Sequence, residues 1–247
     1  MTKTTIAVNS QGFATLTNVA LALQLMDQLV NREPNLPGLG VMSGPSGYGK
    51  SSAMAVTANK HRAIYVECRS YFTKKSSLQA ILDEMAVKAG RTIYEMVAQV
   101  CEELMLSRKP LIVDEVDHLV DRNLVELLRD IYEGSGAAIL MVGEELFPRK
   151  IKRWERFDNR ILAWVLAEPC NKDDARKLAK LYAPDVDIDD AWLTQVLKVT
   201  RHVTRRVSVN IDLGRKEAKK LGKRTINLDW WGDRPFYTGE APVRRTS

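Results

Sequence analysis

A glycine-rich segment with a single lysine, residues 44–51, is the part of the sequence best suited to chemistry. It satisfies the spacing G-x-x-x-x-G-K-[ST], in which glycines let backbone N–H groups turn inward around phosphate oxygens. Lys50 is expected to reach the β- and γ-phosphates of ATP, and the Ser51 hydroxyl to bind Mg²⁺. The predicted nucleotide contacts of this loop are Gly44, Pro45, Ser46, Gly47, Tyr48, Gly49, Lys50, Ser51 and Ser52.

Two carboxylates follow an apolar run, residues 111–113, further along the chain. Asp114 is predicted to hold Mg²⁺ and to complete the nucleotide site, and Glu115 to orient and polarise the attacking water. A carboxylate pair after an apolar run can also be an ordinary strand end, but its combination with the upstream loop favours Mg²⁺-dependent ATP hydrolysis. Asp117 and His118 come next, and we expect capping or packing roles for them.

Short apolar segments alternate with helical ones, which indicates a parallel sheet covered on both faces. The predicted strands are 38–44, 63–68, 110–116, 137–143 and 162–167. The predicted helices are 15–33, 49–59, 76–89, 92–107, 123–133, 172–182, 189–199 and 203–221. We therefore predict an α/β domain over 1–169, with a five-stranded parallel sheet flanked by helices. A small all-helical lid over 170–224 and an extended, partly disordered tail over 225–247 are expected to follow.

Composition excludes several classes of protein. The chain has 247 residues, of which 45% are hydrophobic and 28% charged, which is ordinary for a globular protein. Its apolar runs, such as 137–142, are too short to cross a bilayer. The three cysteines are far apart and lack a Cys-x-x-Cys pair, so neither a disulfide framework nor a zinc site is indicated. We expect a cytoplasmic protein without a membrane partner.

Basic residues are concentrated near the C-terminus. Residues 198–224 contain ten lysines and arginines but only two acidic residues, Asp212 and Glu217. Such clustering is typical of proteins that bind a polyanion. The alternative is a helix face that is simply solvated.

The acidic pair and its surroundings also carry a family resemblance. Residues 114–119, 124–131 and 136–143 resemble AAA+ ATPases that serve DNA transposition, most of all the B protein of Mu-like phages. Target-selection ATPases of Tn7-like elements and insertion-sequence helper ATPases are similar too. The resemblance spans roughly residues 15–220.

This resemblance implies an ATPase in the cytoplasm of a bacterial host. It would bind duplex DNA without sequence specificity, assemble with itself into a filament or ring, activate a transposase as a target-selection factor, and disassemble on hydrolysis. Only about fifteen residues precede the first predicted helix, so DNA binding is expected to rest on the ATPase surface. A helicase-loader-like ATPase of DNA replication is the second hypothesis. A small-molecule kinase on the same scaffold ranks last.

The resemblance further implies that an arginine from a neighbouring subunit completes the active site and stabilises the transition state. Arg153, Arg156 and Arg160 are candidates that the sequence does not separate, and an exposed basic helix is the alternative. Glu144 stands at the first sensor position. Because an acidic side chain beside phosphate is unfavourable, Glu144 can instead begin the next helix.

In the lid, residues 201–210 resemble the start of the helix that carries the second sensor arginine in this family. The resemblance favours Arg206 over Arg205, because Arg206 lies four residues before Asn210, as in the family pattern. Trp230 and Trp231 are expected either to pack against the lid or to anchor a transposase.

Arg69, Lys74 and Lys75 follow the second predicted strand, where related ATPases contact the DNA backbone. Such contacts would be salt-sensitive and independent of sequence. The alternative is that the lysines are ordinary surface residues.

Overall fold

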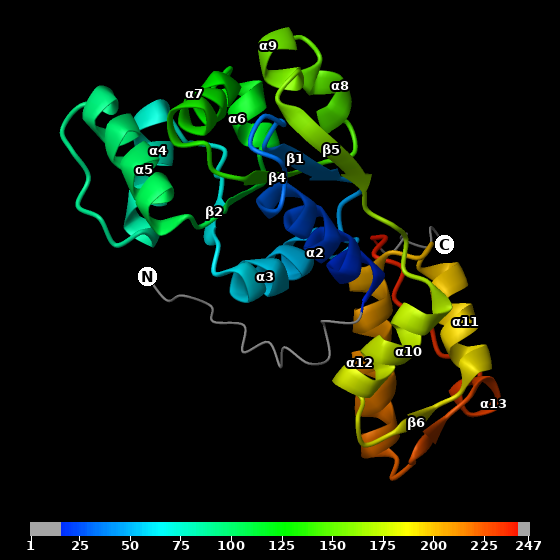
Figure 1. The fold of residues 1–247 in the computed structure, drawn as a ribbon. Coiled ribbons are helices and arrows are strands. Elements are labelled where there is room, and N and C mark those ends of the chain that lie inside the picture. Colours follow the sequence, from blue (N-terminus) through cyan, green and yellow to red (C-terminus); the bar gives the residue numbers. More distant parts are fainter. Residues whose placement is uncertain (1–15, 242–247) are drawn as a thin grey trace. The chain divides into compact units, whose positions relative to one another are not determined.

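The computed structural model describes residues 16–241, which fall into two compact units (Figure 1). The sheet unit comprises Asn18–Ser46 and Lys50–Ala167. The helical unit comprises Gly47–Gly49 and the described residues from Glu168 onward, together with the two described residues before Asn18. The predicted helix start at Thr15 and the outer ends of the predicted domains, 1 and 247, lie outside the described residues.

Five parallel strands form the sheet of the sheet unit, in the order β2-β3-β4-β1-β5. They are β1 (Leu39–Ser43), β2 (Ile64–Glu67), β3 (Leu111–Asp114), β4 (Ile139–Gly143) and β5 (Ile161–Leu166). The inner strands β1, β3 and β4 are buried along their whole length, whereas the edge strands β2 and β5 are partly exposed. Continuous apolar segments fit the inner places because both of their faces are covered. The predicted five-stranded parallel sheet is confirmed.

Helices cover both faces of this sheet. They are α2 (Thr17–Val30), α3 (Lys50–His61), α4 (Lys74–Glu84), α5 (Ile93–Ser107), α6 (Asp117–Asp121), α7 (Val125–Ser135), α8 (Phe147–Ile151) and α9 (Glu155–Asp158). Alternate strand residues such as Val41, Val113 and Met141 share one core cluster with α4 to α9. The intervening Met42 and Leu140 are equally buried, as expected where a second layer of helices covers the other face.

Local sequence explains where two of these helices begin. At α5, Thr92 Oγ1 accepts from the Glu95 N–H, and Glu95 Oε2 accepts from the Thr92 N–H, so the helix starts with a capping box. At α4, Thr73 and Ser76 make a second capping box, and the helix therefore starts two residues before the predicted position. It ends at Glu84 rather than at residue 89, because Ala86 takes a left-handed conformation with φ 59°.

Three short helices, α6, α8 and α9, were not predicted. Each has four or five residues, which is too short to show a helical repeat of apolar residues.

The helical unit contains α10 (Lys172–Tyr182), α11 (Asp190–Val199), α12 (Thr204–Lys220) and α13 (Leu228–Trp231). The expectation of an all-helical lid is wrong in one respect, because β6 (Asp187–Ile188) pairs in parallel with β7 (Thr225–Ile226). Two-residue strands are too short for alternation to reveal them. The predicted division into 1–169, 170–224 and 225–247 stays a prediction.

The region predicted as an extended tail is largely folded. Trp231 is buried, with its ring 5.4 Å from that of Trp192 and 5.4 Å from that of Phe236. Beyond it, residues 232–241 form a segment that we call the strap. Asn210 of α12 holds the strap, because its Nδ2 donates to Tyr237 O at 2.8 Å and its Oδ1 accepts from the Tyr237 N–H at 2.8 Å. The packing role weighed for Trp231 therefore agrees with the structure.

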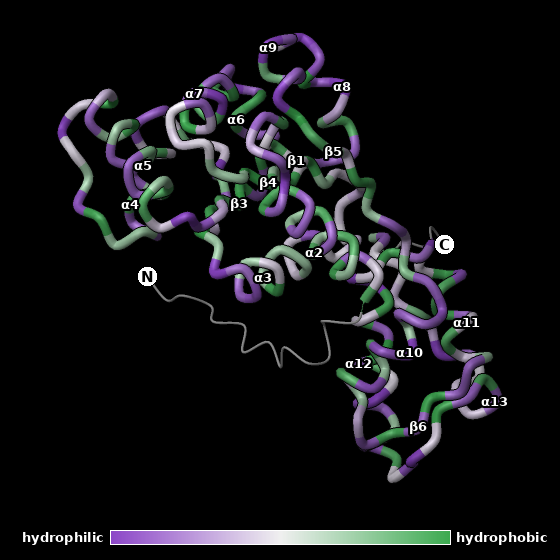
Figure 2. Tube along the Cα trace, in the orientation of Figure 1, coloured by the Kyte–Doolittle hydropathy of each residue, from purple (hydrophilic) through white to green (hydrophobic). Residues whose placement is uncertain are grey.

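In Figure 2, the helices carry both hydrophobic and hydrophilic residues, as expected of helices with one buried face. Within residues 16–241, no helix combines the length and the apolar character that a membrane span requires.

Candidate nucleotide-binding site

The predicted phosphate-binding loop connects β1, which ends at Ser43, to α3, which begins at Lys50. Gly47 and Gly49 have φ angles of 83° and 85°, in the left-handed region that glycine favours. A Cβ atom on Gly47 would also come within 2.8 Å of Val203 Cγ1. The segment therefore has the strand–turn–helix geometry that the motif requires.

Lys50 folds back onto this loop. Its Nζ donates to Gly44 O at 2.6 Å and to Pro45 O at 3.0 Å. Burial lowers the pKa of Lys50, while the charges of Glu115 and Asp114 act in the opposite direction. The ammonium group thus lies in the electrostatic field of Asp114 and Glu115, the two carboxylates that the sequence predicted to share its nucleotide site.

Ser51 and Ser52 follow in the first turn of α3, and both are exposed. The first N–H groups of a helix lack partners within the helix, and its N-terminus carries partial positive charge. The Ser51 hydroxyl is therefore accessible at a helix end that favours anions. Its contact with Mg²⁺ stays a prediction.

Asp114, the last residue of β3, is only 2% exposed. Its Oδ1 accepts from the Glu115 N–H at 2.9 Å, and its Oδ2 accepts from the Tyr65 hydroxyl at 2.8 Å. Burial, followed by the charge of Asp114, raises the pKa of Tyr65, so its hydroxyl remains a donor. Both carboxylate oxygens of Asp114 are therefore held in place.

The contact with Tyr65 is a feature that sequence reasoning missed. Tyr65 looks like an ordinary β-strand residue, and only the register of β2 with β3 brings it to Asp114. The only signal in the sequence was a hydroxyl group in a predicted strand whose other residues, apart from Glu67, are apolar.

Glu115 follows Asp114 in a left-handed conformation, with φ 54°. Burial and then the charge of Asp114 raise its pKa, while Lys50 and His118 act in the opposite direction. A raised pKa makes a carboxylate a stronger base than an ordinary glutamate. The geometry is thus compatible with the predicted role of Glu115 in polarising water.

Asp117 ties three segments together. It is 4% exposed, its Oδ2 accepts from the Glu144 N–H at 2.6 Å, and its Oδ1 lies 3.1 Å from Lys150 Nζ. These contacts agree with the predicted capping and packing role of Asp117. Glu144 does not begin a helix, because α8 begins at Phe147 and Glu144 lies in the preceding turn.

Comparison with known proteins agrees with this geometry. Residues 33–151 match the family model described as AAA domain. These residues form an AAA-type P-loop domain. They contain both the loop of Lys50 and the acidic pair of Asp114 and Glu115. No curated protein matches the sequence.

Solved structures similar to this chain share the fold of the AAA domain at low sequence identity. The Aeropyrum pernix ORC2 protein, in ADPNP-ADP complexes, is 14% identical with a TM-score of 0.65, over 86% of this chain and 64% of that one. CDC6P from Pyrobaculum aerophilum is 16% identical with a TM-score of 0.64, over 89% and 68%. The Thermotoga maritima RuvB Holliday junction branch migration motor is 19% identical with a TM-score of 0.56, over 86% and 65%.

This chain therefore spans about two thirds of the length of those proteins. The similarity confirms the α/β fold of the AAA domain. The finer resemblance to the Mu-like B protein stays a prediction.

The three candidate arginines, which lie in the sheet unit just after the residues that match the AAA domain, differ in their surroundings. Arg153 donates to Val120 O at 3.0 Å and lies 3.8 Å from the centre of the Trp154 ring. Arg160 pairs with Glu133 at 3.1 Å. Arg156 in α9 is exposed and has no hydrogen-bond or ion-pair partner among residues 16–241. The structure thus distinguishes Arg156 as the arginine with its charge available to another molecule.

The three residues predicted to contact DNA also differ in whether their charges are already paired. Arg69 pairs with Glu67 at 2.9 Å, and Lys75 Nζ donates to Arg91 O at 3.2 Å. Lys74, in the first turn of α4, is exposed and has no partner within the described part of the chain. Lys74 is therefore the most available cation of this segment, while the DNA role of all three residues stays a prediction.

Arg206 is half-buried near the beginning of α12. The preceding Arg205 donates its N–H to Gly47 O at 3.0 Å, within the helical unit. A Cβ atom on Gly239 would come within 2.7 Å of Arg206 Nε, so the strap lies directly against this guanidinium group. The role of Arg206 in nucleotide binding stays a prediction.

The basic segment 198–224 is less free than its composition indicates. Arg215 and Lys219 pair with Asp185 at 2.6 Å and 2.8 Å, and Lys216 pairs with Asp212 at 2.6 Å. These pairs neutralise part of the charge that favoured a polyanion partner. A smaller basic surface remains for such a partner.

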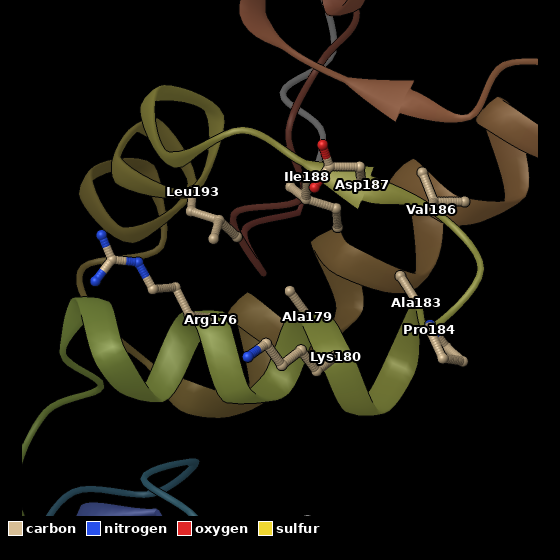
Figure 3. A pocket seen from close by; sticks show the side chains of 9 residues that line it. All are labelled: Arg176, Ala179, Lys180, Ala183, Pro184, Val186, Asp187, Ile188 and Leu193. Atoms are coloured by element: carbon tan, nitrogen blue, oxygen red, sulfur yellow. The ribbon is translucent and has the colours of Figure 1, made fainter.

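The helical unit also has a pocket of about 280 Å³, between α10, β6 and α11 (Figure 3). Its lining is Arg176, Ala179, Lys180, Ala183, Pro184, Val186, Asp187, Ile188 and Leu193. Arg176 is already paired with Asp173 and Asp190. None of the predicted site residues lines this pocket.

Proposed function

We propose that this chain binds and hydrolyses ATP at the loop after β1 and uses that reaction to control its action on duplex DNA. The observation that carries the ATPase proposal is the charge arrangement around Lys50. Lys50 directly follows the loop after β1, and Asp114 and Glu115 stand at the end of β3, another strand of the same parallel sheet. Strand ends of a parallel sheet meet at one edge, where α/β proteins commonly bind ligands.

In this proposal, Lys50 and the backbone of residues 44–49 bind the phosphates. Glu115, with its raised pKa, orients and polarises the attacking water. Arg156 of a neighbouring copy supplies positive charge to the transition state, because its guanidinium group has no partner among the described residues of its own chain.

The residues present fit Mg²⁺. Asp114 is buried, and hydrogen bonds at both of its oxygens fix the plane of its carboxylate. Residues 16–241 contain no group of three or more His, Cys, Asp or Glu side chains that could hold a metal. Mg²⁺ bound with nucleotide usually needs only one or two carboxylates, with phosphates and waters as the other ligands. Asp114 and Ser51 would hold Mg²⁺, which would neutralise charge on the phosphates.

Two substitutions test the ATPase proposal. Lys50→Ala should weaken binding of a fluorescent ATP analogue by more than about tenfold, because it removes the cation at the phosphates. Glu115→Gln should keep binding and lower turnover by about 10²-fold or more, because the amide is a poor base. The exposed Lys60→Ala, at the other end of α3, is the matched control. Equal turnover in Glu115→Gln and the unaltered chain would contradict the proposal.

We further propose that the DNA transaction belongs to replication, in the manner of an initiator or helicase loader. Structures with this fold include the ORC2 and CDC6P proteins and the Aeropyrum pernix ORC1 protein in complex with DNA. Low sequence identity means that these likenesses support the proposal through the fold alone. Lys74 and the unpaired cations of 198–224 supply the charge for the DNA backbone.

DNA binding is tested with fluorescent duplexes of two unrelated sequences, with and without a non-hydrolysable ATP analogue. We expect similar affinity for both duplexes, stronger binding with the analogue, and a steep loss of binding with salt. Lys74→Ala should lower the salt dependence by about one phosphate contact, whereas Lys109→Ala, an exposed lysine before β3, should not. No binding at low salt would contradict the DNA proposal.

Activation of a transposase is the second candidate, favoured by the sequence resemblance of residues 114–143. Both candidates predict self-association on DNA, because both need Arg156 from a neighbouring copy. They differ in the client protein. Stable co-purification with a replicative helicase supports the replication role, and co-purification with a transposase supports the transposition role.

A further inference from the structure

The carboxylate of Asp114 is held by two hydrogen bonds of different origin. One comes from the Glu115 N–H, which directly follows it in the chain, and the other from the Tyr65 hydroxyl, 49 positions earlier. The first bond forms wherever the chain turns in this way after β3. The second depends on a particular side chain in a particular strand, so substitution can remove it selectively.

Strand register explains why a tyrosine, and not a shorter residue, reaches this carboxylate. Glu67 pairs with Asp114, and Tyr65 pairs with Ile112. Tyr65 therefore begins two positions back along the sheet, about 6.5–7 Å from the level of Asp114. A short hydroxyl side chain such as serine cannot cover that distance, whereas the Tyr65 hydroxyl reaches Asp114 Oδ2 at 2.8 Å.

Burial makes this hydrogen bond consequential. Asp114 is 2% exposed, so its Oδ2 has little access to solvent that could replace the Tyr65 hydroxyl. Groups that hydrogen-bond to metal ligands fix the orientation of those ligands, and their removal typically costs about 10–100-fold in metal affinity or activity. A carboxylate fixed before the metal arrives also loses less rotational freedom on binding.

We propose that Tyr65 is a positioning residue that orients the Asp114 carboxylate for Mg²⁺ and so sets the Mg²⁺ requirement of the nucleotide site. Tyr65 does not touch nucleotide or the reacting atoms in this role, because it acts through Asp114. The inference rests on the proposed function, since it assigns the metal role to Asp114.

The test uses Tyr65→Phe, which removes the hydroxyl and keeps the ring. Tyr132→Phe is the matched control, because Tyr132 is also half-buried and its hydroxyl has no hydrogen-bond partner among residues 16–241. Binding of a fluorescent ATP analogue is measured at increasing Mg²⁺ and again in EDTA, and ATP turnover is measured over the same Mg²⁺ range.

We expect Tyr65→Phe to raise the Mg²⁺ concentration for half-maximal effect by about tenfold or more, in both binding and turnover. Analogue binding in EDTA and turnover at saturating Mg²⁺ should stay close to those of Tyr132→Phe. In an Asp114→Asn background, Tyr65→Phe should have no further effect on the Mg²⁺ response, because the residue through which it acts is already altered.

Two results would overturn the role of Tyr65. One is a Mg²⁺ response of Tyr65→Phe equal to that of Tyr132→Phe. The other is an equal loss of binding in EDTA and in Mg²⁺, since the hydroxyl would then support the fold rather than the metal ligand. Failure of the unaltered chain to bind the analogue at any Mg²⁺ concentration would instead overturn the proposed function.

Discussion

The sheet unit and the helical unit place their polar groups by different means. In the sheet unit, Lys50, Asp114 and Glu115 stand where a strand ends and the next segment begins, so short-range sequence determines their positions. In the helical unit, the strap reaches back over α12 and is held there by Asn210, 27 positions away from Tyr237. Local motifs therefore reveal the first kind of site, whereas the second depends on tertiary contacts. Substitutions at the long-range contacts of the helical unit should accordingly affect the stability of that unit more than the chemistry of the loop.

The largest expected effect is on the stability of the helical unit. Trp192 has no exposed surface and packs against Trp231 and Phe236. Trp192→Ala should lower the free energy of unfolding by about 3–5 kcal/mol, through lost burial and a cavity. Trp164, in the sheet unit, is 42% exposed, so Trp164→Ala should lower the free energy of unfolding far less. Denaturant unfolding followed by circular dichroism measures both, and equal losses would contradict the distinction between core and surface tryptophans.

The next effect concerns chemistry in the sheet unit. Arg156→Ala should lower turnover of the assembled protein by about 10²-fold, because one transition-state charge is lost, while nucleotide binding persists. Arg160→Ala, which removes an arginine already paired with Glu133, is the matched control. Mixing Arg156→Ala with Glu115→Gln should restore part of the turnover if the arginine acts on a neighbouring copy. A mixture as inactive as its separate components would rule out that arrangement.

A smaller effect is expected at the strap. Asn210→Ala removes the amide that bonds both Tyr237 N–H and Tyr237 O, at a cost of about 1–3 kcal/mol in the free energy of unfolding. The released strap should also be cut faster by trypsin at Arg234. Asn31→Ala, which removes an exposed amide bonded to Asp27 O at 2.8 Å, is the control. Unchanged trypsin cleavage in Asn210→Ala would show that other contacts suffice to hold the strap.

The sequence predicts features that depend on local motifs better than features that depend on tertiary contacts. Apolar runs predicted all five strands of the sheet, and the three inner strands β1, β3 and β4 are buried along their whole length. The glycine-rich motif placed the loop correctly. The start of the helix after β4 was harder to predict from Glu144. That helix, α8, begins at Phe147, after a turn in which Asp117 accepts a hydrogen bond from the Glu144 N–H. Tyr65 was not predicted at all, because strand register is a property of the folded sheet.

The C-terminal region shows the same limit more strongly. Its tryptophans have no periodicity, so the sequence indicated an extended tail, yet Trp231 is 3% exposed through contacts with Trp192 and Phe236. The basic segment was overestimated for a related reason. Asp185 lies outside that segment in the sequence, but it pairs with Arg215 and Lys219 in the fold.

The smallest expected effect is the pH dependence of those ion pairs. Hydrogen bonds from Arg215 and then Lys219 hold the pKa of Asp185 well below its ordinary value of 3.8. A carboxyl with a lowered folded pKa contributes stability above its unfolded pKa, and that contribution is lost as pH falls through the folded pKa. Thermal unfolding between pH 7 and pH 2 should therefore show a slightly weaker acid dependence in Asp185→Asn than in the unaltered chain. The exposure of these side chains keeps the difference small, and added salt should reduce it further. Asp83→Asn, a substitution at an exposed carboxyl of α4 that has no ion-pair partner within residues 16–241, should leave the acid dependence unchanged. If the stability of Asp185→Asn and that of Asp83→Asn depend equally on pH, then the ion pairs of Asp185 with Arg215 and Lys219 do not stabilise the helical unit in solution.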